Sequence, residues 1–366
     1  MEAVTLGESK ASPNAALLAR LENTALAATR EAALACQEWV GRGDGKGADG
    51  AATNAMRAEL AAAPGTGTVV IGEGEKDEAP MLFNGETVGE GGSLAFDIAV
   101  DPLECTSLCA AGMPGSLTTI AMAEAGSMWD PGPAFYMDKL VAPGEARGAI
   151  DINDTPEANL ERVAAALGKS VGDLRVVVLQ KPRHDDLIER LRAAGAHVST
   201  PSEGDVGGAL AVLLPDGEAD LAMGIGGTPE GVMTACAVRA LGGAMQGKLA
   251  PQKDDEKRAL EGTDLERVLE VEDMVQGEAF FVATGVTGGL VAAPRTQAGW
   301  HVTESMVVAA GSVKRVIAHS ALPNADGDGD ANYSASMPNN STATAASSGA
   351  DSTAAAANQE TDGGTN

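Results

Sequence analysis

Acidic side chains follow two apolar runs of the chain at the positions where a buried strand would end. Asp101 comes directly after the run 96–100, and Glu73 follows the run 69–71 through a single glycine. An unpaired acid at such a place would be poorly solvated. A further acid, Glu104, lies three residues after Asp101, just before a stretch of small residues that is typical of a helix. These positions suit carboxylates that hold a cation.

Four glycine-rich loops carry these and other acids, and each lies next to a predicted strand. The loops span residues 41–50, 72–80, 101–106 and 224–231. None has the spacing of a nucleotide loop, since Lys46 lacks the partner residues of a P-loop and Pro229 interrupts the last glycine pattern. Hard divalent cations take carboxylate oxygens from rigid loops and keep positions open for phosphate and water. For each loop taken alone, a solvated turn is the alternative interpretation.

The residues after Asp101 add a second feature of a phosphate site. The backbone N–H groups of Cys105 and Thr106 would face the same mouth, and the start of a helix attracts phosphate. Cations together with a phosphate cradle predict the hydrolysis of a phosphoester.

Hydrophobic periodicity predicts the elements that would position these loops. In the first half, helical spacing indicates helices over 13–40 and 49–63, and short apolar runs indicate strands at 68–71, 96–100 and 117–123. From residue 174 onward, strands at 174–179, 197–200 and 219–225 alternate with helices at 185–195, 206–214 and 232–241. The sequence therefore predicts an α/β fold whose sites form at the carboxyl ends of the strands.

The composition argues against several classes of protein. Acids outnumber bases by 52 to 25, giving a net charge of -27, so nucleic acid is not expected as a partner. No run approaches the length of a membrane span, and the N-terminus lacks the pattern of a secretion signal. The four cysteines form no CxxC pair, which favours reduced thiols in the cytoplasm. The acidity itself is typical of a solvated surface.

The domain organisation follows from a change in composition near residue 321. We expect a flexible N-terminus over 1–12, a folded domain over 13–320 and a disordered acidic tail over 321–366, which contains six acids and no base. Within the folded domain, a metal-site half over about 13–150 would precede an α/β half over about 151–320. Asp326, Asp328 and Asp330 imitate a calcium loop, but Ala331 and Met337 replace its turn glycine and its bidentate glutamate.

Longer motifs add a resemblance to a known family. The segment DPLECT resembles the signature of the lithium-sensitive, metal-dependent sugar and inositol phosphatases. The strings GRGDGKGADGAATNAMR, VVIGEGEKDEAPML, GPAFYMDKL, KPRHDDLI, GDV and GIGGTPEGV resemble the class II (GlpX-type) fructose-1,6-bisphosphatases of bacteria. The resemblance runs in order from about residue 13 to about residue 320. Relatives in photosynthetic bacteria also act on sedoheptulose-1,7-bisphosphate.

This resemblance implies a layered α/β/α/β/α sandwich, a sugar bisphosphate substrate and Mn²⁺ or Mg²⁺ as cofactor, and we expect a homo-oligomer. It implies metal ligation by Asp49, Glu73, Asp101, Glu104 and Glu230. Asp77, with Thr106, would position or deprotonate the attacking water. Substrate contacts would come from Glu104, Cys105, Thr106, Tyr136, Arg183, His184, Asp185, Glu203, Gly204, Asp205 and Gly227.

Two positions depart from the family pattern. Cys105 stands where the family has glycine, a change that is costly if φ is positive there and mild if φ is helical. Its thiol would be a reactive thiolate beside metals and a helix start, or a buried and inert small residue. Gly45 stands where the family has lysine, and Lys46 comes one residue late.

Other functions stay open on the sequence alone. Sedoheptulose-1,7-bisphosphate is an alternative or second substrate. A sugar-phosphate-binding protein without activity is an alternative from another class, although the six proposed metal and base residues are all acids here. An inositol monophosphatase shares the chemistry of DPLECT but not the KPRH and GIGGTPEG motifs.

Overall fold

A computed structural model of the chain describes residues 13–72 and 82–322, with side chains from residue 20 onward. The predicted segment 1–12 and nearly all of the predicted tail 321–366 lie outside the described residues. In the part that is described, no helix is long and apolar enough to cross a membrane. The division of the folded domain near residue 150 stays a prediction.

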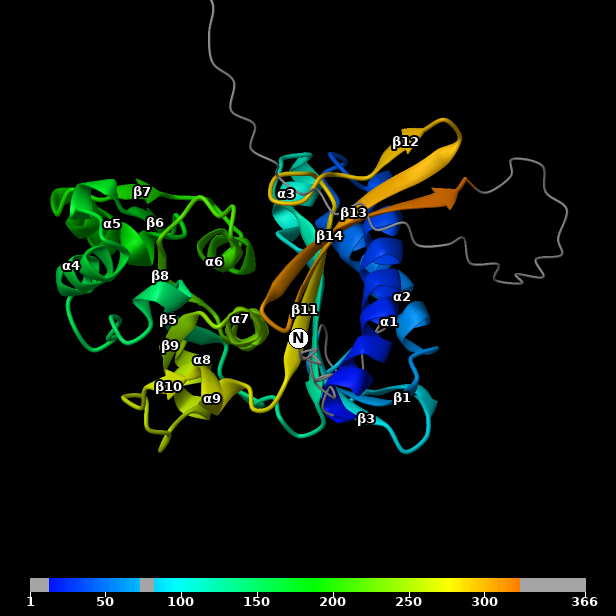
Figure 1. Ribbon diagram of the computed structural model, residues 1–366, viewed down its shortest axis with the longest axis horizontal. Helices are drawn as coiled ribbons and strands as arrows, with labels where there is room; N and C mark the ends of the chain where they lie inside the picture. Colours follow the sequence, from blue (N-terminus) through cyan, green and yellow to red (C-terminus); the bar gives the residue numbers. More distant parts are fainter. Residues whose placement is uncertain (1–12, 73–81, 323–366) are drawn as a thin grey trace, which may run out of the picture. The chain divides into compact units, whose positions relative to one another are not determined.

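The first sheet has eight strands and combines segments from both ends of the chain (Figure 1). β3 pairs parallel with β1 and antiparallel with β4, and β11 pairs antiparallel with both β4 and β13. In spatial order the strands are β12 (Arg295–Gln297), β13 (Trp300–Ala309), β11 (Ala279–Gly285), β4 (Leu117–Glu124), β3 (Ala95–Glu104), β1 (Gly65–Ile71) and β2 (Thr87–Gly91), with β14 (Ser312–Ala321) paired to β13.

The second sheet has six strands and contains the predicted alternating series. β6 pairs parallel with β7 and β8, whereas β5 pairs antiparallel with β8 and β9. In spatial order the strands are β10 (Leu269–Glu270), β9 (Ala244–Leu249), β5 (Tyr136–Ala142), β8 (Leu221–Gly227), β6 (Arg175–Val177) and β7 (His197–Ser199).

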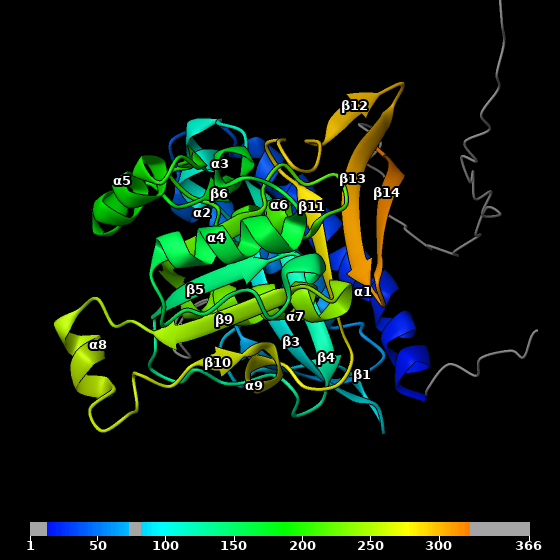
Figure 2. The same ribbon diagram turned by 60° about the vertical axis from the view of Figure 1, so that its left-hand side comes forward.

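Helices cover both faces of each sheet, as Figures 1 and 2 show. The outer face of the first sheet packs against α1 (Pro13–Ala35) and α2 (Gly45–Leu60). Between the sheets lie α6 (Asp205–Leu213) and α7 (Thr228–Leu241), and on the outer face of the second sheet lie α4 (Pro156–Leu167) and α5 (Asp185–Ala193). This order confirms the expected α/β fold and its five layers. Short helices α3 (Thr106–Ala111), α8 (Asp254–Ala259) and α9 (Val271–Met274) join these elements.

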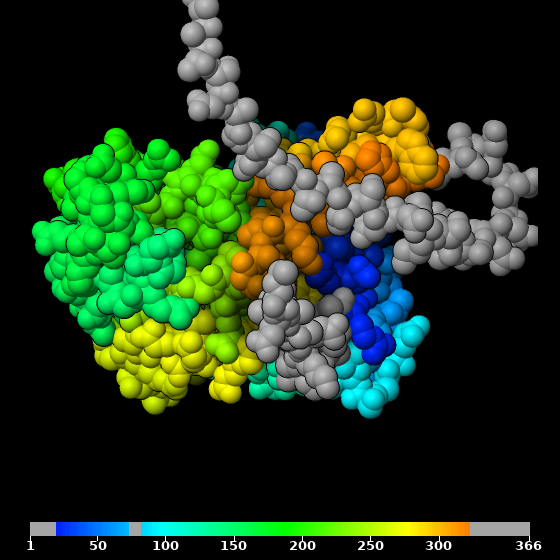
Figure 3. All heavy atoms as spheres, viewed as in Figure 1, coloured from blue at the N-terminus to red at the C-terminus, as the bar shows by residue number. Residues whose placement is uncertain are grey.

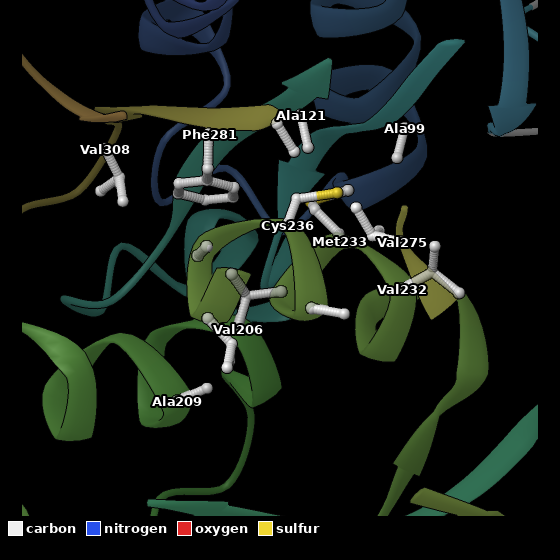
Figure 4. Packing of buried hydrophobic residues seen from close by; sticks show 14 of the residues in the cluster. Ala99, Ala121, Val206, Ala209, Val232, Met233, Cys236, Val275, Phe281 and Val308 are labelled. Carbon is white, nitrogen blue, oxygen red and sulfur yellow. The ribbon is translucent and has the colours of Figure 1, made fainter. Parts of the chain in front are cut away.

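The middle layer explains why the sequence shows few clean alternations of apolar and polar residues. α7 contacts both sheets, and its residues from Gly231 to Val238 are all buried. Figure 4 shows Met233 and Cys236 of α7 beside Ala121 and Phe281 of the first sheet. Because helices also cover the other face of that sheet, β4 and β11 are buried along nearly their whole length.

The surface follows the same division (Figure 3). Residues of the second sheet and its helices, drawn in green and yellow, lie on one side, and α1, α2 and the strands near them lie on the other. The starts of α6 and α7 belong to the middle layer, and the end of β3 belongs to the sheet beside it. They provide the walls of the candidate site.

Candidate active site

A cavity of about 540 Å³ opens where β3 ends and where α6 and α7 begin. It brings together most of the residues predicted for the site, which are Asp49, Asp101, Glu104, Cys105, Thr106, Glu203, Gly204, Asp205, Gly227 and Glu230. Two basic residues, Lys46 and Lys181, line the same cavity. Lys181 is the first residue of the KPRH motif and was not among the residues predicted for the site.

Four of the predicted substrate contacts do not line this cavity. Arg183 and Tyr136 form a pair of their own, with the guanidinium carbon 5.4 Å from the centre of the ring. The Nε and Nη2 atoms of Arg183 both donate to the carbonyl of Ile225, at 3.0 and 2.7 Å. Asp185 borders a separate hollow on α5, and His184 is buried.

Two further predicted residues, Glu73 and Asp77, lie outside the described residues. Their proposed roles as metal ligand and base therefore stay predictions. The strand before them, β1, does end at Ile71, next to β3 in the first sheet.

The end of β3 is irregular, and this irregularity brings two acids to one cavity. The pairing of β3 with β4 shifts register between Asp101 and Glu104, as in a bulge that redirects side chains. One oxygen of Asp101 accepts the N–H of Leu103 at 3.0 Å. The carbonyl of Glu104 accepts the hydroxyl of Ser116 at 2.9 Å. These bonds fix the backbone from which both carboxylates reach the cavity.

Cys105 connects β3 to α3 in a left-handed backbone conformation, with φ 62° and ψ 50°. Residues with a side chain rarely adopt this conformation, which glycine adopts freely. The structure thus selects the costly one of the two alternatives for this departure from the family pattern. A Cβ atom on Gly204 would lie 3.5 Å from the sulfur of Cys105, so the extra side chain fits beside a glycine.

The thiol of Cys105 is buried, as the second of its two interpretations expects. The side chain is 8% exposed. Burial raises the pKa of this thiol far above its usual value, and the neighbouring carboxylates of Glu104 and Glu203 raise it further. The burial therefore supports the inert interpretation, and the reactivity of this thiol beside bound cations stays a prediction.

Thr106 begins α3 and keeps acceptor capacity toward the cavity. Its hydroxyl donates to the carbonyl of Leu103 at 2.8 Å, which leaves the oxygen lone pairs to accept a hydrogen bond from water. Gly45, at the start of α2, makes room for it, because a Cβ there would lie only 3.1 Å from Cγ2 of Thr106. Lys46 still lines the cavity from the position one residue later.

The carboxylates of the site are costly to ionise together. Burial raises the pKa of Glu230 to about 7; Lys139 opposes this shift, and the charges of Glu104 and Asp205 add to it. Burial likewise raises the pKa of Glu104, which is 5% exposed, and that of Asp49. A cation among these groups would remove much of the repulsion that raises their pKa values.

The donor chemistry fits a hard divalent cation. Carboxylate oxygens from α2, β3 and α7 line one cavity, and such oxygens are the ligands that Mg²⁺ and Mn²⁺ prefer. Within 13–72 and 82–322, however, no three His, Cys, Asp or Glu side chains stand close enough together to hold an ion between them. The end of β1, where Glu73 follows, is the adjacent source of a further ligand.

His184 joins two backbone segments instead of facing the cavity. Its Nδ1 lies 2.7 Å from the carbonyl of Leu179, and its Nε2 accepts the N–H of Ile225 at 2.7 Å. Nδ1 therefore carries the proton of a neutral ring, and both nitrogens are engaged. Burial lowers the pKa of this imidazole. The predicted substrate contact by His184 gains no support from this geometry.

Comparisons with known proteins agree with the motifs around this cavity. The family model described as bacterial fructose-1,6-bisphosphatase, glpX-encoded, matches residues 19–320. The class 2 fructose-1,6-bisphosphatase of Haemophilus influenzae is 43% identical over 277 residues, covering 71% of this chain and 83% of that protein. Fructose-1,6-bisphosphatase 1 class 2 of Escherichia coli K12 is 44% identical over 277 residues, with 71% and 82% covered. The chain belongs to the GlpX family of bacterial fructose-1,6-bisphosphatases.

Family membership confirms the resemblance drawn from the motifs and the expected enzyme class, a phosphoric monoester hydrolase. GlpX-type enzymes are metal-dependent phosphatases, which agrees with the acids around the cavity. The left-handed backbone at Cys105 is one that glycine adopts freely, which agrees with the glycine in the motif that this segment resembles.

Substitution of Cys105 tests the strained connection. We expect Cys105→Gly to leave unfolding free energy unchanged or higher, because relief of about 1 kcal/mol of backbone strain offsets the lost side-chain packing. Cys105→Val, which is β-branched, is expected to lose about 2 kcal/mol or more. Chemical denaturation of both variants measures this difference. Equal stability of the two variants would contradict the strain.

The pH dependence of stability tests the neutral state of His184. Its folded pKa lies below the unfolded value of about 6.5, so the stability that the neutral ring contributes is complete above pH 6.5 and is lost as pH falls below it. His184→Gln can keep both backbone hydrogen bonds but does not titrate. Between pH 8 and 5.5, the wild type should lose up to about 1.4 kcal/mol relative to this variant. A wild-type advantage over the variant that stays constant would show an unshifted pKa, and one that grows toward low pH would show a raised pKa; either result would contradict the neutral ring.

Proposed function

We propose that the protein hydrolyses the 1-phosphate of fructose-1,6-bisphosphate to fructose-6-phosphate and phosphate, with Mg²⁺ or Mn²⁺. The observation that supports this most directly is the single cavity, which collects ten of the predicted site residues in a chain of the GlpX family. The reaction would serve gluconeogenesis or sugar-phosphate metabolism.

Asp49, Asp101, Glu104 and Glu230 would hold the cations, with Glu73 beyond the described residues. When bound, such cations neutralise the phosphate, lower the pKa of a bound water and stabilise the leaving alkoxide. The carboxylates come from three different elements, so the fold, and not a local motif, sets their spacing.

Thr106 would orient the attacking water. Because its hydroxyl proton is donated to Leu103, its oxygen can only accept, so the water would direct one O–H toward it. The other proton would be left for a base, the role proposed for Asp77 and a prediction still. Thr106 therefore acts through orientation and need not ionise.

Lysines at the cavity would meet the phosphate charges. Lys46 and Lys181 approach the cavity from opposite layers, α2 and the loop after β6. Arg183 stands on the Tyr136 ring beside β8 and makes no further hydrogen bond with the described residues after its two to Ile225. Its remaining N–H groups suit a second phosphate of the substrate.

We also infer that the enzyme acts in the cytoplasm, where its thiols stay reduced; all four cysteines, which fall within the described part, are free. A homo-oligomer stays a prediction. The choice between the six-carbon and seven-carbon bisphosphates is open, and sedoheptulose-1,7-bisphosphate is the alternative substrate.

Acid-to-amide substitutions test the metal ligands. Asp101→Asn and Glu230→Gln should lower kcat/KM for fructose-1,6-bisphosphate at least about 100-fold, because each removes charge from a proposed ligand at nearly constant shape. Phosphate release with Mg²⁺ and with Mn²⁺, on both bisphosphates, measures activity and substrate choice together.

A matched control is Glu157→Gln on α4, which breaks a surface pair with Arg190 and should keep full activity. Full activity of Asp101→Asn at saturating metal would refute the metal-site assignment. If the wild type released no phosphate with either metal, the protein would instead be a sugar-phosphate-binding protein.

A further inference from the structure

Lys139 is a buried cation that the proposed mechanism leaves without a role. It lies on β5, is 5% exposed, and belongs to the same strand face as Met137 and Val141, which pack in the middle layer. Its Nζ donates to a carboxylate oxygen of Asp205 and, at 2.6 Å, to the carbonyl of Gly227. A lysine is almost never buried this far without a specific partner.

Glycines line the space around the Lys139 side chain. A Cβ on Gly226 would lie 1.9 Å from Asp205 Oδ2 and 3.0 Å from Lys139 Nζ. A Cβ on Gly231 would lie 3.3 Å from Cδ of the same lysine. These glycines belong to the GIGGTPEG motif, so the motif provides the space in which the ion pair sits.

The ion pair stands at the junction of two helix starts. Asp205 is the first residue of α6, and Gly227 directly precedes α7, whose first turn carries Glu230. A Cβ on Gly227 would overlap the carboxylate of Glu230, at 1.7 Å from Oε2. Lys139 also lowers the pKa values of Glu230 and Glu104. Its charge therefore acts on three acids that line one cavity.

Of these three acids, only Asp205 has its carboxylate bonded to the lysine. A carboxylate whose oxygen is held by an ammonium is a poor ligand for a divalent cation, because the two cations compete for the same lone pairs and repel each other. Glu104 and Glu230 remain available to an ion, and Asp205 does not.

We propose that Lys139 is a positioning residue that withholds Asp205 from the divalent cations and keeps it for the substrate. This inference rests on the proposed function. Without the lysine, Asp205 would be an additional anionic ligand beside Glu104 and Glu230, and the wall that faces the sugar would lose its fixed carboxylate.

Binding of Mn²⁺ to the full-length, substrate-free enzyme tests this role of Lys139 without turnover. The electron paramagnetic resonance signal of free Mn²⁺ measures the binding. Lys139→Met should bind Mn²⁺ at least threefold more tightly, or bind an additional ion, and its KM for fructose-1,6-bisphosphate should rise at least tenfold. Adding Asp205→Asn to Lys139→Met should return Mn²⁺ binding to the wild-type level.

Asp205→Asn alone should change Mn²⁺ affinity in the opposite direction. It therefore tests the proposal even if Lys139→Met does not fold. The ammonium, no longer neutralised by Asp205, would then interact more strongly with Glu230 and Glu104 and repel the cation. Mn²⁺ should therefore bind at least threefold more weakly. Asp220→Asn is the matched control, because it removes the acid of another lysine pair, with Lys169, and should leave Mn²⁺ binding unchanged.

A purely structural lysine would give a different result. In that case Lys139→Met would have a lower melting temperature but would bind Mn²⁺ equally or more weakly than the wild type. Asp205→Asn would bind Mn²⁺ as the wild type does. Either Mn²⁺ result overturns the inference. An active wild type with these results would refute the role of Lys139 alone. An inactive wild type would refute the proposed function instead.

Discussion

Repulsion among buried carboxylates is the constraint on which the rest of this structure depends. Glu104 and Glu230 lose most of their water where α7 packs between two sheets, and Asp205 stands beside them. Burial alone raises the pKa of such groups, and each like charge raises it further. The fold limits this cost with one buried ammonium, Lys139, and the donor set that remains suits divalent cations. A metal-dependent phosphatase would gain from this arrangement, because the same acids would bind the ions that activate water.

The close approach of these charges depends on residues without side chains. Gly226 and Gly227 lie so near to the carboxylates of Asp205 and Glu230 that a Cβ atom would overlap them. Cys105 shows the reverse case, a side chain in a left-handed position that glycine suits better. The sulfur of Cys105 lies beside Gly204, where a Cβ atom would be 3.5 Å from it. The positions of these glycines in the chain therefore follow from the geometry of the site.

Much of the fold could be predicted from local patterns. The helices expected over 185–195, 206–214 and 232–241 lie at 185–193, 205–213 and 228–241, because their apolar spacing is local information. The assembly of strands could not be predicted in the same way. β11 returns to pair with the early strand β4, and β13 and β14 extend the sheet from β11. Pairings across such sequence distances leave no periodic signal in either segment.

The candidate site shows the same limit. The acids at the end of β3 could be found because an apolar run followed by an acid signals a buried charge. Lys139 was missed, although its alternation with Met137 and Val141 places a lysine on an apolar face, since the neighbouring Asp138 makes the segment resemble an exposed strand. For His184, the sequence does not show which backbone groups the ring meets, and its expected substrate contact stays a prediction.

A crystal structure of the enzyme with Mn²⁺, with anomalous scattering measured at the manganese edge, tests most directly whether these acids hold cations. We expect an anomalous peak within about 2.5 Å of oxygens from Asp101, Glu104 or Glu230, with Asp205 still bonded to Lys139. A fully active crystal form in which manganese binds elsewhere and these carboxylates make no contact with it would contradict the account.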